Sequence, residues 1–131
     1  MTQRSLLMIM ARDFASRLAT AVFLVDPDGA LVYFNEAAER VLGEAFVEGR
    51  SVPAREWSTA FTPEDEHGEP VPLASLPLGI ALTERTPSHG AIRIVGGDGV
   101  RRSIEVTAFP LFAHADEFVG AVAIFWEHTG S

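Results

Sequence analysis

The segment AVFLVDPDGALVYF, residues 21–34, decides the fold. Two runs of aliphatic and aromatic residues flank a short polar turn. Pro27 presets the first corner of that turn, Asp26 can bond the turn backbone, and Gly29 accepts a left-handed conformation. The pattern predicts a β-hairpin. Both faces of its strands are apolar, so we expect both faces to be covered.

A helix is predicted directly after this hairpin. Asn35, the only asparagine of the chain, precedes the sequence EAAERVLG. Its side-chain oxygen can accept a hydrogen bond from a free amide of the first helical turn, and Glu36 and Glu39 suit the positive helix end. Gly43 provides the C-terminal stop. Capping explains Asn35 better than a functional role does.

The rest of the chain predicts further helices and then strands. Residues 44–72 are rich in Pro, Gly and acidic residues, and we expect short helical turns and loops there. A helix is expected from Ser75 to Arg85, with Pro77 tolerated in its first turn. Three strands of an antiparallel meander follow, at Ala91–Val95, Val100–Phe112 and Phe118–Trp126. The predicted fold class is α+β, with a five-stranded antiparallel sheet and helices on one face.

Residues 1–20 predict an extra N-terminal amphipathic helix. Apolar residues recur at every fourth position from Leu6 to Leu18, and their neighbours widen the stripe. The helix either only packs on its own domain or also covers a second molecule. A homodimer would use its excess of apolar side chains, which are Leu6, Leu7, Ile9, Met10 and Phe14.

Composition excludes several classes of function. A chain of 131 residues is the size of one domain. Its net charge of −8 argues against nucleic acid as a partner. The absence of lysine excludes Schiff-base chemistry and the phosphate-binding P-loop. The absence of cysteine excludes disulfides and thiolate chemistry and fits a cytoplasmic location, and no stretch is long enough to cross a bilayer.

The sequence resembles the PAS domain family from about Ala21 to Thr129. The resemblance rests on FLVDPDG (23–29) running into VYFNEAAERVLG (32–43), and further on PLGIAL (77–82) and GDGVRRSIEV (97–106). It implies a PAS domain over residues 21–129, which follows the amphipathic helix that periodicity predicts over residues 1–20. The end of the chain departs from the family, because Glu127 or His128 stands where an Asp-x-Thr output motif has its aspartate.

The resemblance implies a sensor and dimerisation module rather than an enzyme. Such a module regulates an attached C-terminal effector domain of a longer protein, for example a histidine kinase of a two-component system, a serine phosphatase or a cyclic-dinucleotide enzyme. A ligand-free module for protein interaction is the alternative. We expect neither haem nor covalent flavin, because residues 76–85 of the central helix contain no histidine and the chain contains no cysteine. Noncovalent flavin has no positive support in the sequence.

An apolar ligand pocket is predicted between the sheet and the central helix. A glycine inside a helix costs about 1 kcal/mol relative to alanine, so Gly79 indicates a close approach by backbone or ligand. A small hydrophobic or fatty-acid-like molecule would suit such walls, although the same residues suffice for a packed core. The expected lining is Leu24, Val41, Leu42, Leu78, Gly79, Leu82, Ile92, Ile94, Ile104, Val106 and Ala108.

The polar candidates for chemistry are few. His67, His89 and His114 lie in or beside predicted loops and turns, where solvated side chains are more common than metal ligands. A rival hypothesis is a small cone-shaped isomerase or hydratase with one acidic base in an apolar cavity. Glu105 is the only carboxylate in the centre of a strand, but its alternation with Ile104 places it on the polar face.

Overall fold

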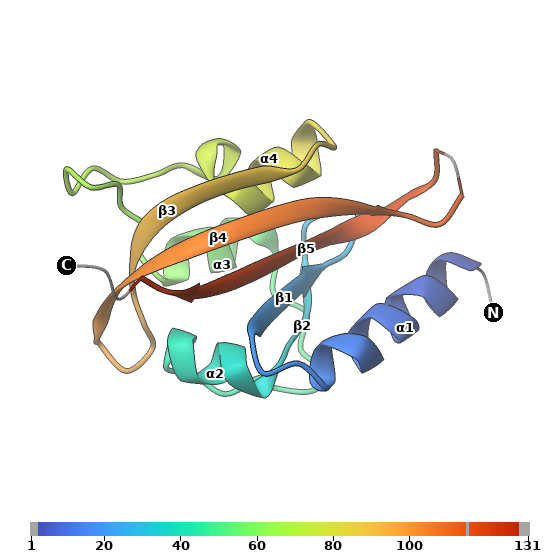
Figure 1. Ribbon diagram of the computed structural model, residues 1–131, viewed down its shortest axis with the longest axis horizontal. Coiled ribbons are helices and arrows are strands. Elements are labelled where there is room, and N and C mark those ends of the chain that lie inside the picture. The colour runs from blue at the N-terminus through green and yellow to red at the C-terminus, as the bar shows by residue number, and fades with distance from the viewer. Residues whose placement is uncertain (1–2, 115, 129–131) are drawn as a thin grey trace.

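The computed structural model describes residues 3–114 and 116–128. Within these residues, five antiparallel strands form one sheet in the order β2-β1-β5-β4-β3, which confirms the predicted fold class (Figure 1). The strands are β1 (Ala21–Val25), β2 (Leu31–Phe34), β3 (Ser88–Val95), β4 (Arg101–Phe112) and β5 (Phe118–Glu127). The helices are α1 (Gln3–Ser16), α2 (Glu36–Leu42), α3 (Ala54–Ala60) and α4 (Pro77–Thr83), with a 3-10 turn η1 (Leu73–Ser75) before α4.

The two faces of the sheet are covered differently. The inner face packs against α2, α3 and α4 and forms the main apolar core. Figure 1 looks onto the outer face, with α3 and α4 behind the long strands. A smaller apolar cluster lies on the outer face, where Ala15 of α1 packs against Val22 and Leu24 of β1 and Val122 of β5. Both faces of the hairpin are therefore buried, as its sequence predicts.

The turn between β1 and β2 has the predicted chemistry. Asp26 Oδ1 accepts hydrogen bonds from the backbone N–H groups of Asp28 (2.9 Å) and Ala30 (3.0 Å). Gly29 adopts a φ of 87° and donates its N–H to the carbonyl of Asp26 (2.9 Å). This backbone conformation is one that residues with a Cβ rarely adopt, and it closes the hairpin.

Asn35 caps α2 as predicted and also fixes the end of α1. Its Oδ1 accepts hydrogen bonds from the N–H groups of Ala38 and Val22, both at 3.0 Å. Its Nδ2 donates to the carbonyls of Ala15 and Thr20, both at 2.9 Å. The side chain is buried and joins the segment after α1, the strand β1 and the helix α2.

The helix expected at residues 75–85 is shorter in the structure, where α4 spans Pro77–Thr83. Leu76 precedes a proline, which disfavours helical backbone, and it adopts extended angles of φ −73° and ψ 145°. At the other end, Arg85 lies in the left-handed region with a φ of 57°. Gly79 is explained by a close approach of backbone, since a Cβ at this position would overlap the carbonyl of Leu73.

Candidate functional site

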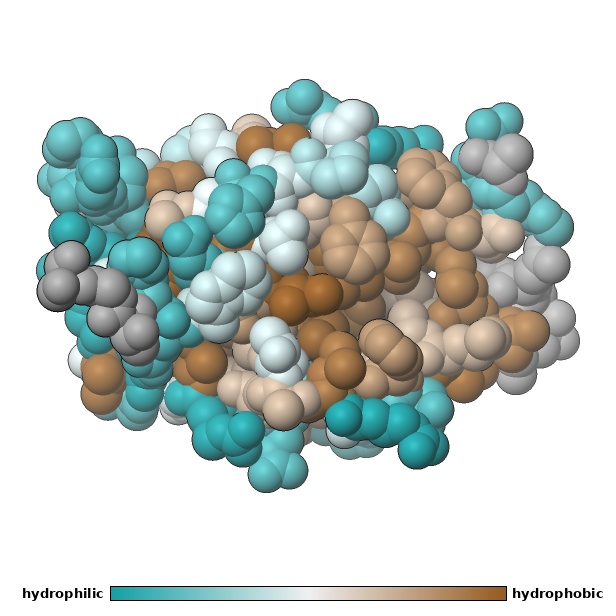
Figure 2. Space-filling view, in the orientation of Figure 1, coloured by the Kyte–Doolittle hydropathy of each residue, from teal (hydrophilic) through white to brown (hydrophobic). Residues whose placement is uncertain are grey.

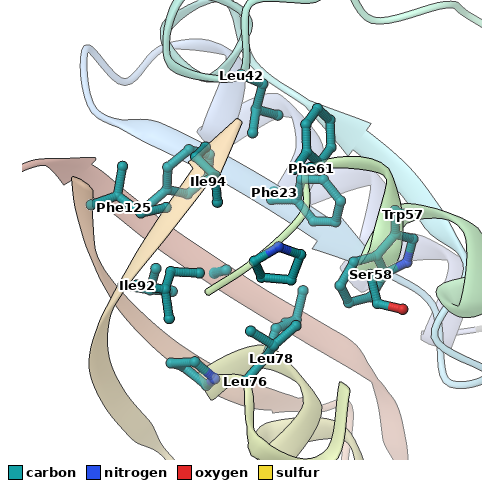
Figure 3. Close-up of a pocket in the computed structure, with 15 residues that line it drawn as sticks. Phe23, Leu42, Trp57, Ser58, Phe61, Leu76, Leu78, Ile92, Ile94 and Phe125 are labelled. Carbon is teal, nitrogen blue, oxygen red and sulfur yellow. The ribbon is translucent and has the colours of Figure 1, made fainter. Parts of the chain in front are cut away.

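A cavity of about 90 Å³ lies between the inner face of the sheet and the helices α3 and α4. Side chains from β1, β3, β4 and β5 form one wall, and residues of α3 and α4 form the other, as Figure 3 shows. The walls are almost entirely aliphatic and aromatic. Such a space selects a ligand by shape and apolar surface rather than by hydrogen bonds.

Aromatic side chains shape the part of the cavity near α3. The rings of Phe23 and Trp57 meet edge to face, with centroids 5.3 Å apart. The indole Nε1 of Trp57 donates a hydrogen bond to the carbonyl of Gly29 (2.8 Å), which fixes the ring against the β1–β2 turn. The position of this wall is therefore set by the hairpin.

Six of the residues expected to line the pocket lie in the wall of the cavity. They are Leu42, Leu78, Ile92, Ile94, Ile104 and Val106. Leu24 lies in the outer cluster, on the opposite side of the sheet. Val41 and Leu82 pack against the core beside the cavity, and Ala108 is buried in that core, but none of the three lines the cavity, and neither does Gly79.

The sequence analysis missed the aromatic part of the wall, which consists of Phe23, Trp57, Phe61 and Phe125. Two signals were available. Phe23 lies one residue before Leu24 and therefore faces the other side of the strand. Trp57 and Phe61 are four residues apart, which places them on one side of a short helix.

The outer face carries an apolar groove of about 230 Å³ between α1 and the sheet. Figure 2 shows hydrophobic atoms gathered around a hollow in the middle of this face. The side chains that border it come from α1 and the segment after it, and from β1, β4 and β5; they include Phe14, Leu18, Leu24, Phe109, Leu111 and Ile124. Ala11 and Ala15 of α1 pack in the outer cluster, and their short side chains leave space between the helix and the sheet.

The residues expected at a dimer interface lie on α1 (Figure 1). Leu6, Ile9, Met10 and Phe14 are exposed, with Phe14 at 66%, and Leu7 is half-buried. These exposed side chains form an apolar ridge next to the groove.

Arg12 adds a charged contact between α1 and the body of the domain. The guanidinium of Arg12 pairs with Glu48 and lies 4.5 Å from the ring centroid of Tyr33 and 5.6 Å from that of Phe46. It lowers the pKa of the Glu48 carboxyl, mainly through their hydrogen bond.

The polar candidates lie outside the cavity. His67 and His114 are exposed in loops, and Glu105 lies on the outer face of β4, 3.0 Å from His89 Nε2. Over residues 3–114 and 116–128, no three histidine or acidic side chains are grouped so that they could hold a metal ion. No helix in this part of the chain is long and apolar enough to span a membrane.

Comparisons with known proteins agree with this architecture. A family model described as PAS fold matches residues 15–131. The PAS domain of a protein from Colwellia psychrerythraea has a TM-score of 0.64 and 17% identity, and the match covers 94% of this chain and 98% of that one. No curated protein matches the chain.

The names of two further solved structures describe domains of regulatory proteins. The PAS domain of nitrogen regulation protein NR(II) from Vibrio parahaemolyticus has a TM-score of 0.60 and 19% identity, covering 91% of this chain and 98% of that one. The LOV domain of a blue-light activated histidine kinase from Erythrobacter litoralis has a TM-score of 0.64 and 22% identity, covering 88% and 100%. At these identities the likeness concerns the fold alone.

Proposed function

Because the chain belongs to the PAS fold family, we propose that it is a cytoplasmic signal-sensing module that regulates an attached effector domain. The effector classes in this proposal are a histidine kinase, which is the class of protein that contains one of the similar domains, a phosphatase and a cyclic-dinucleotide enzyme. The observation that carries the sensing role is the apolar cavity between the sheet and α3 and α4.

The size of the cavity restricts the ligand. A cavity of roughly 150 Å³ in an engineered protein holds one benzene molecule. The cavity of this chain, at about 90 Å³, is smaller. Its input is therefore a compact apolar molecule of a few heavy atoms, and a fatty-acid-like ligand requires the walls to move apart.

Two alanines that face each other across β4 and β5 allow a matched test. Ala123 lines the cavity, whereas its direct partner Ala108 is buried but does not line it. We expect Ala123→Val to fill free space with little loss of stability. Ala108→Val overpacks the core and costs about 1–3 kcal/mol.

The binding experiment uses xenon and cyclopropane as probes, both of which are smaller than benzene. Saturating probe raises the thermal midpoint of the parent chain and of Ala108→Val, measured against each protein without probe, and fails to raise that of Ala123→Val. Native mass spectrometry of the freshly purified protein then searches for a retained natural ligand. A parent chain that neither probe stabilises favours the ligand-free interaction module.

We also propose a homodimer through α1, supported by its exposed apolar ridge. Ile9 on α1 and Val47 on the loop after α2 are similarly exposed, at 51% and 55%. Ile9→Glu is expected to give a monomer by light scattering, and Val47→Glu leaves the dimer intact. A dimer that persists in Ile9→Glu places the interface elsewhere, and a monomeric parent chain contradicts the proposal.

The geometry favours this module over the isomerase-like enzyme. Among the residues that the structure describes, no carboxylate lines the cavity, and Glu105, the base of that hypothesis, lies on the opposite face of the sheet. An acidic base has to reach the proton it abstracts. We therefore assign no catalytic role to the domain.

A further inference from the structure

The groove between α1 and the outer face of the sheet has the features of a binding site for a small molecule. Its volume of about 230 Å³ exceeds that of the inner cavity, at about 90 Å³, and Figure 2 looks onto it. Its floor includes Val22, Leu24 and Val122, each of which is at most 6% exposed. Phe14, which also borders the groove, is 66% exposed. The space therefore extends from the surface down to buried residues of the sheet.

The groove exists because α1 presents small side chains to the sheet. Ala11 and Ala15 are four residues apart and so share one side of the helix. The end of α1 is held by Asn35, whose side-chain amide donates to the carbonyls of Ala15 (2.9 Å) and Leu18 (3.5 Å). Hydrogen bonds at its end thus keep the helix close to the sheet, while its alanines leave the space between the two layers unfilled.

The chemistry of the walls favours an uncharged apolar ligand. All ten residues that line the groove have apolar side chains. A bound water molecule needs two to four polar partners, and these side chains offer none. The neighbouring arginines of α1 already have acidic partners, because Arg12 pairs with Glu48 and Nε of Arg17 lies 3.4 Å from Oδ2 of Asp13. Neither water nor a carboxylate headgroup therefore suits this groove.

The volume sets the size of the ligand. A cavity of roughly 150 Å³ holds one benzene molecule, so a groove of about 230 Å³ has room for a benzene ring with about one to three further heavy atoms. We propose that the groove binds a compact, uncharged apolar molecule of this size, and that the bound molecule keeps α1 on the sheet. This site is separate from the inner cavity, which lies on the opposite face and is too small for such a ring unless its walls move apart.

NMR spectroscopy with toluene as the probe tests the location of the site. We expect intermolecular NOEs from toluene to the methyl groups of Leu24, Val122 and Ile124, which line the groove. No NOEs are expected to Ile92 and Val106, which line the inner cavity. A toluene molecule that gives no NOEs to the groove, or that contacts only the inner cavity, overturns the proposal.

Hydrogen exchange tests the effect on α1. Because toluene contacts both the helix and the sheet, separation of α1 from the sheet requires its release. At a free concentration of about ten times its Kd, toluene is expected to slow the exchange of α1 amides by about tenfold. Unchanged exchange in α1 while the groove is occupied contradicts the second half of the proposal.

Variants that fill the groove provide a matched comparison. Ala11→Leu places a larger side chain in the groove and is expected to remove the NOEs from toluene. Ala60→Leu makes the same substitution at an exposed residue of α3, beyond the opposite face of the sheet, and retains them. Ile124→Phe fills the groove from β5, so the test does not depend on the folding of one variant. Toluene that still binds the groove in both filling variants, or that is lost equally in Ala60→Leu, overturns the proposal.

Ala11→Leu is also the background in which the two probes of the inner cavity are compared. Xenon and cyclopropane are small enough to enter the outer groove as well. In Ala11→Leu, a thermal shift that Ala123→Val removes and Ala108→Val retains therefore belongs to the inner cavity. The two sites can then fail independently of each other.

A second copy of the chain is the competing occupant of the groove, because the exposed ridge of α1 lies beside it. The toluene experiment is therefore repeated with Ile9→Glu, the variant expected to be a monomer. We expect the same NOEs and the same Kd, within about twofold, in the parent chain and in Ile9→Glu. Binding that is confined to Ile9→Glu shows that the second copy fills the groove in the parent chain and overturns the proposal.

Discussion

Replacing Asn35 by alanine removes five side-chain hydrogen bonds that join three elements of the fold. Two of them satisfy the N–H groups of Val22 and Ala38, and three go from the side-chain amide to the carbonyls of Ala15, Leu18 and Thr20. The side chain is 1% exposed, so water has little access to the groups left behind. A buried donor without a partner costs about 1–3 kcal/mol, and a lost helix cap costs about 1 kcal/mol.

We therefore expect Asn35→Ala to lose about 3–5 kcal/mol of unfolding free energy. The measurement is urea unfolding followed by far-UV circular dichroism, analysed at constant m-value. Ser16→Ala is the control, because it removes an exposed hydroxyl that donates only to the carbonyl of Asp13 within the last turns of α1. This control is expected to change stability by at most about 0.5 kcal/mol.

Asn35→Asp separates the hydrogen bonds that the side-chain oxygen accepts from those that the side-chain amide donates. It retains the oxygen that accepts from Val22 and Ala38 and replaces the amide donor by an oxygen that faces the carbonyls of Ala15 and Thr20. We expect faster hydrogen exchange in α1 at neutral pH and partial recovery at acidic pH, where a protonated carboxyl can donate to one carbonyl. A loss below about 1 kcal/mol in Asn35→Ala would refute the reasoning, because the buried groups would then have found other partners.

Two further predictions concern backbone packing and a charged turn. Gly79→Ala is expected to lower the free energy of unfolding by about 1–3 kcal/mol in urea, because the added Cβ overlaps the carbonyl of Leu73. An alanine variant as stable as the parent chain would show that η1 packs differently against α4. Hydrogen bonds from Arg102 and from the backbone N–H of Val100 lower the pKa of Asp98 to about 2. The stabilisation by Asp98 is present above about pH 4 and lost as the pH falls towards 2, so the stability difference between the parent and Asp98→Asn should disappear over that range in acid titrations.

The elements that the sequence predicted well depend on neighbouring residues. The turn at Asp26–Gly29 and the cap at Asn35 are local, because their hydrogen bonds join residues no more than four positions apart. The strands of the meander are defined by turn residues at both ends. Backbone preference also explains the error in α4, since the residue before Pro77 disfavours helical angles and shortens the predicted helix.

The site was predicted less completely, because its residues come from distant parts of the chain. Ile104 and Val106 were placed by alternation in β4, which has one polar and one apolar face. The same reasoning fails in β1, where all five residues are buried and alternation gives no sign of which side faces the helices. For this reason Leu24 was predicted to line the cavity and Phe23 was not. The structure places Phe23 in the wall of the cavity and Leu24 in the outer cluster.

The close approach indicated by Gly79 shows how a correct local inference can be incomplete. The sequence required a neighbour near the helix, and the structure identifies it as the carbonyl of Leu73. The glycine thus allows η1 to pack tightly against α4, while the cavity owes its volume to side chains further along the sheet. Tight backbone packing and an open cavity therefore occur on the same helix, and a variant at Gly79 cannot distinguish them. Ala123 and Ala108 can, because they differ in exposure to the cavity while sharing one residue type, one pair of strands and one face of the sheet.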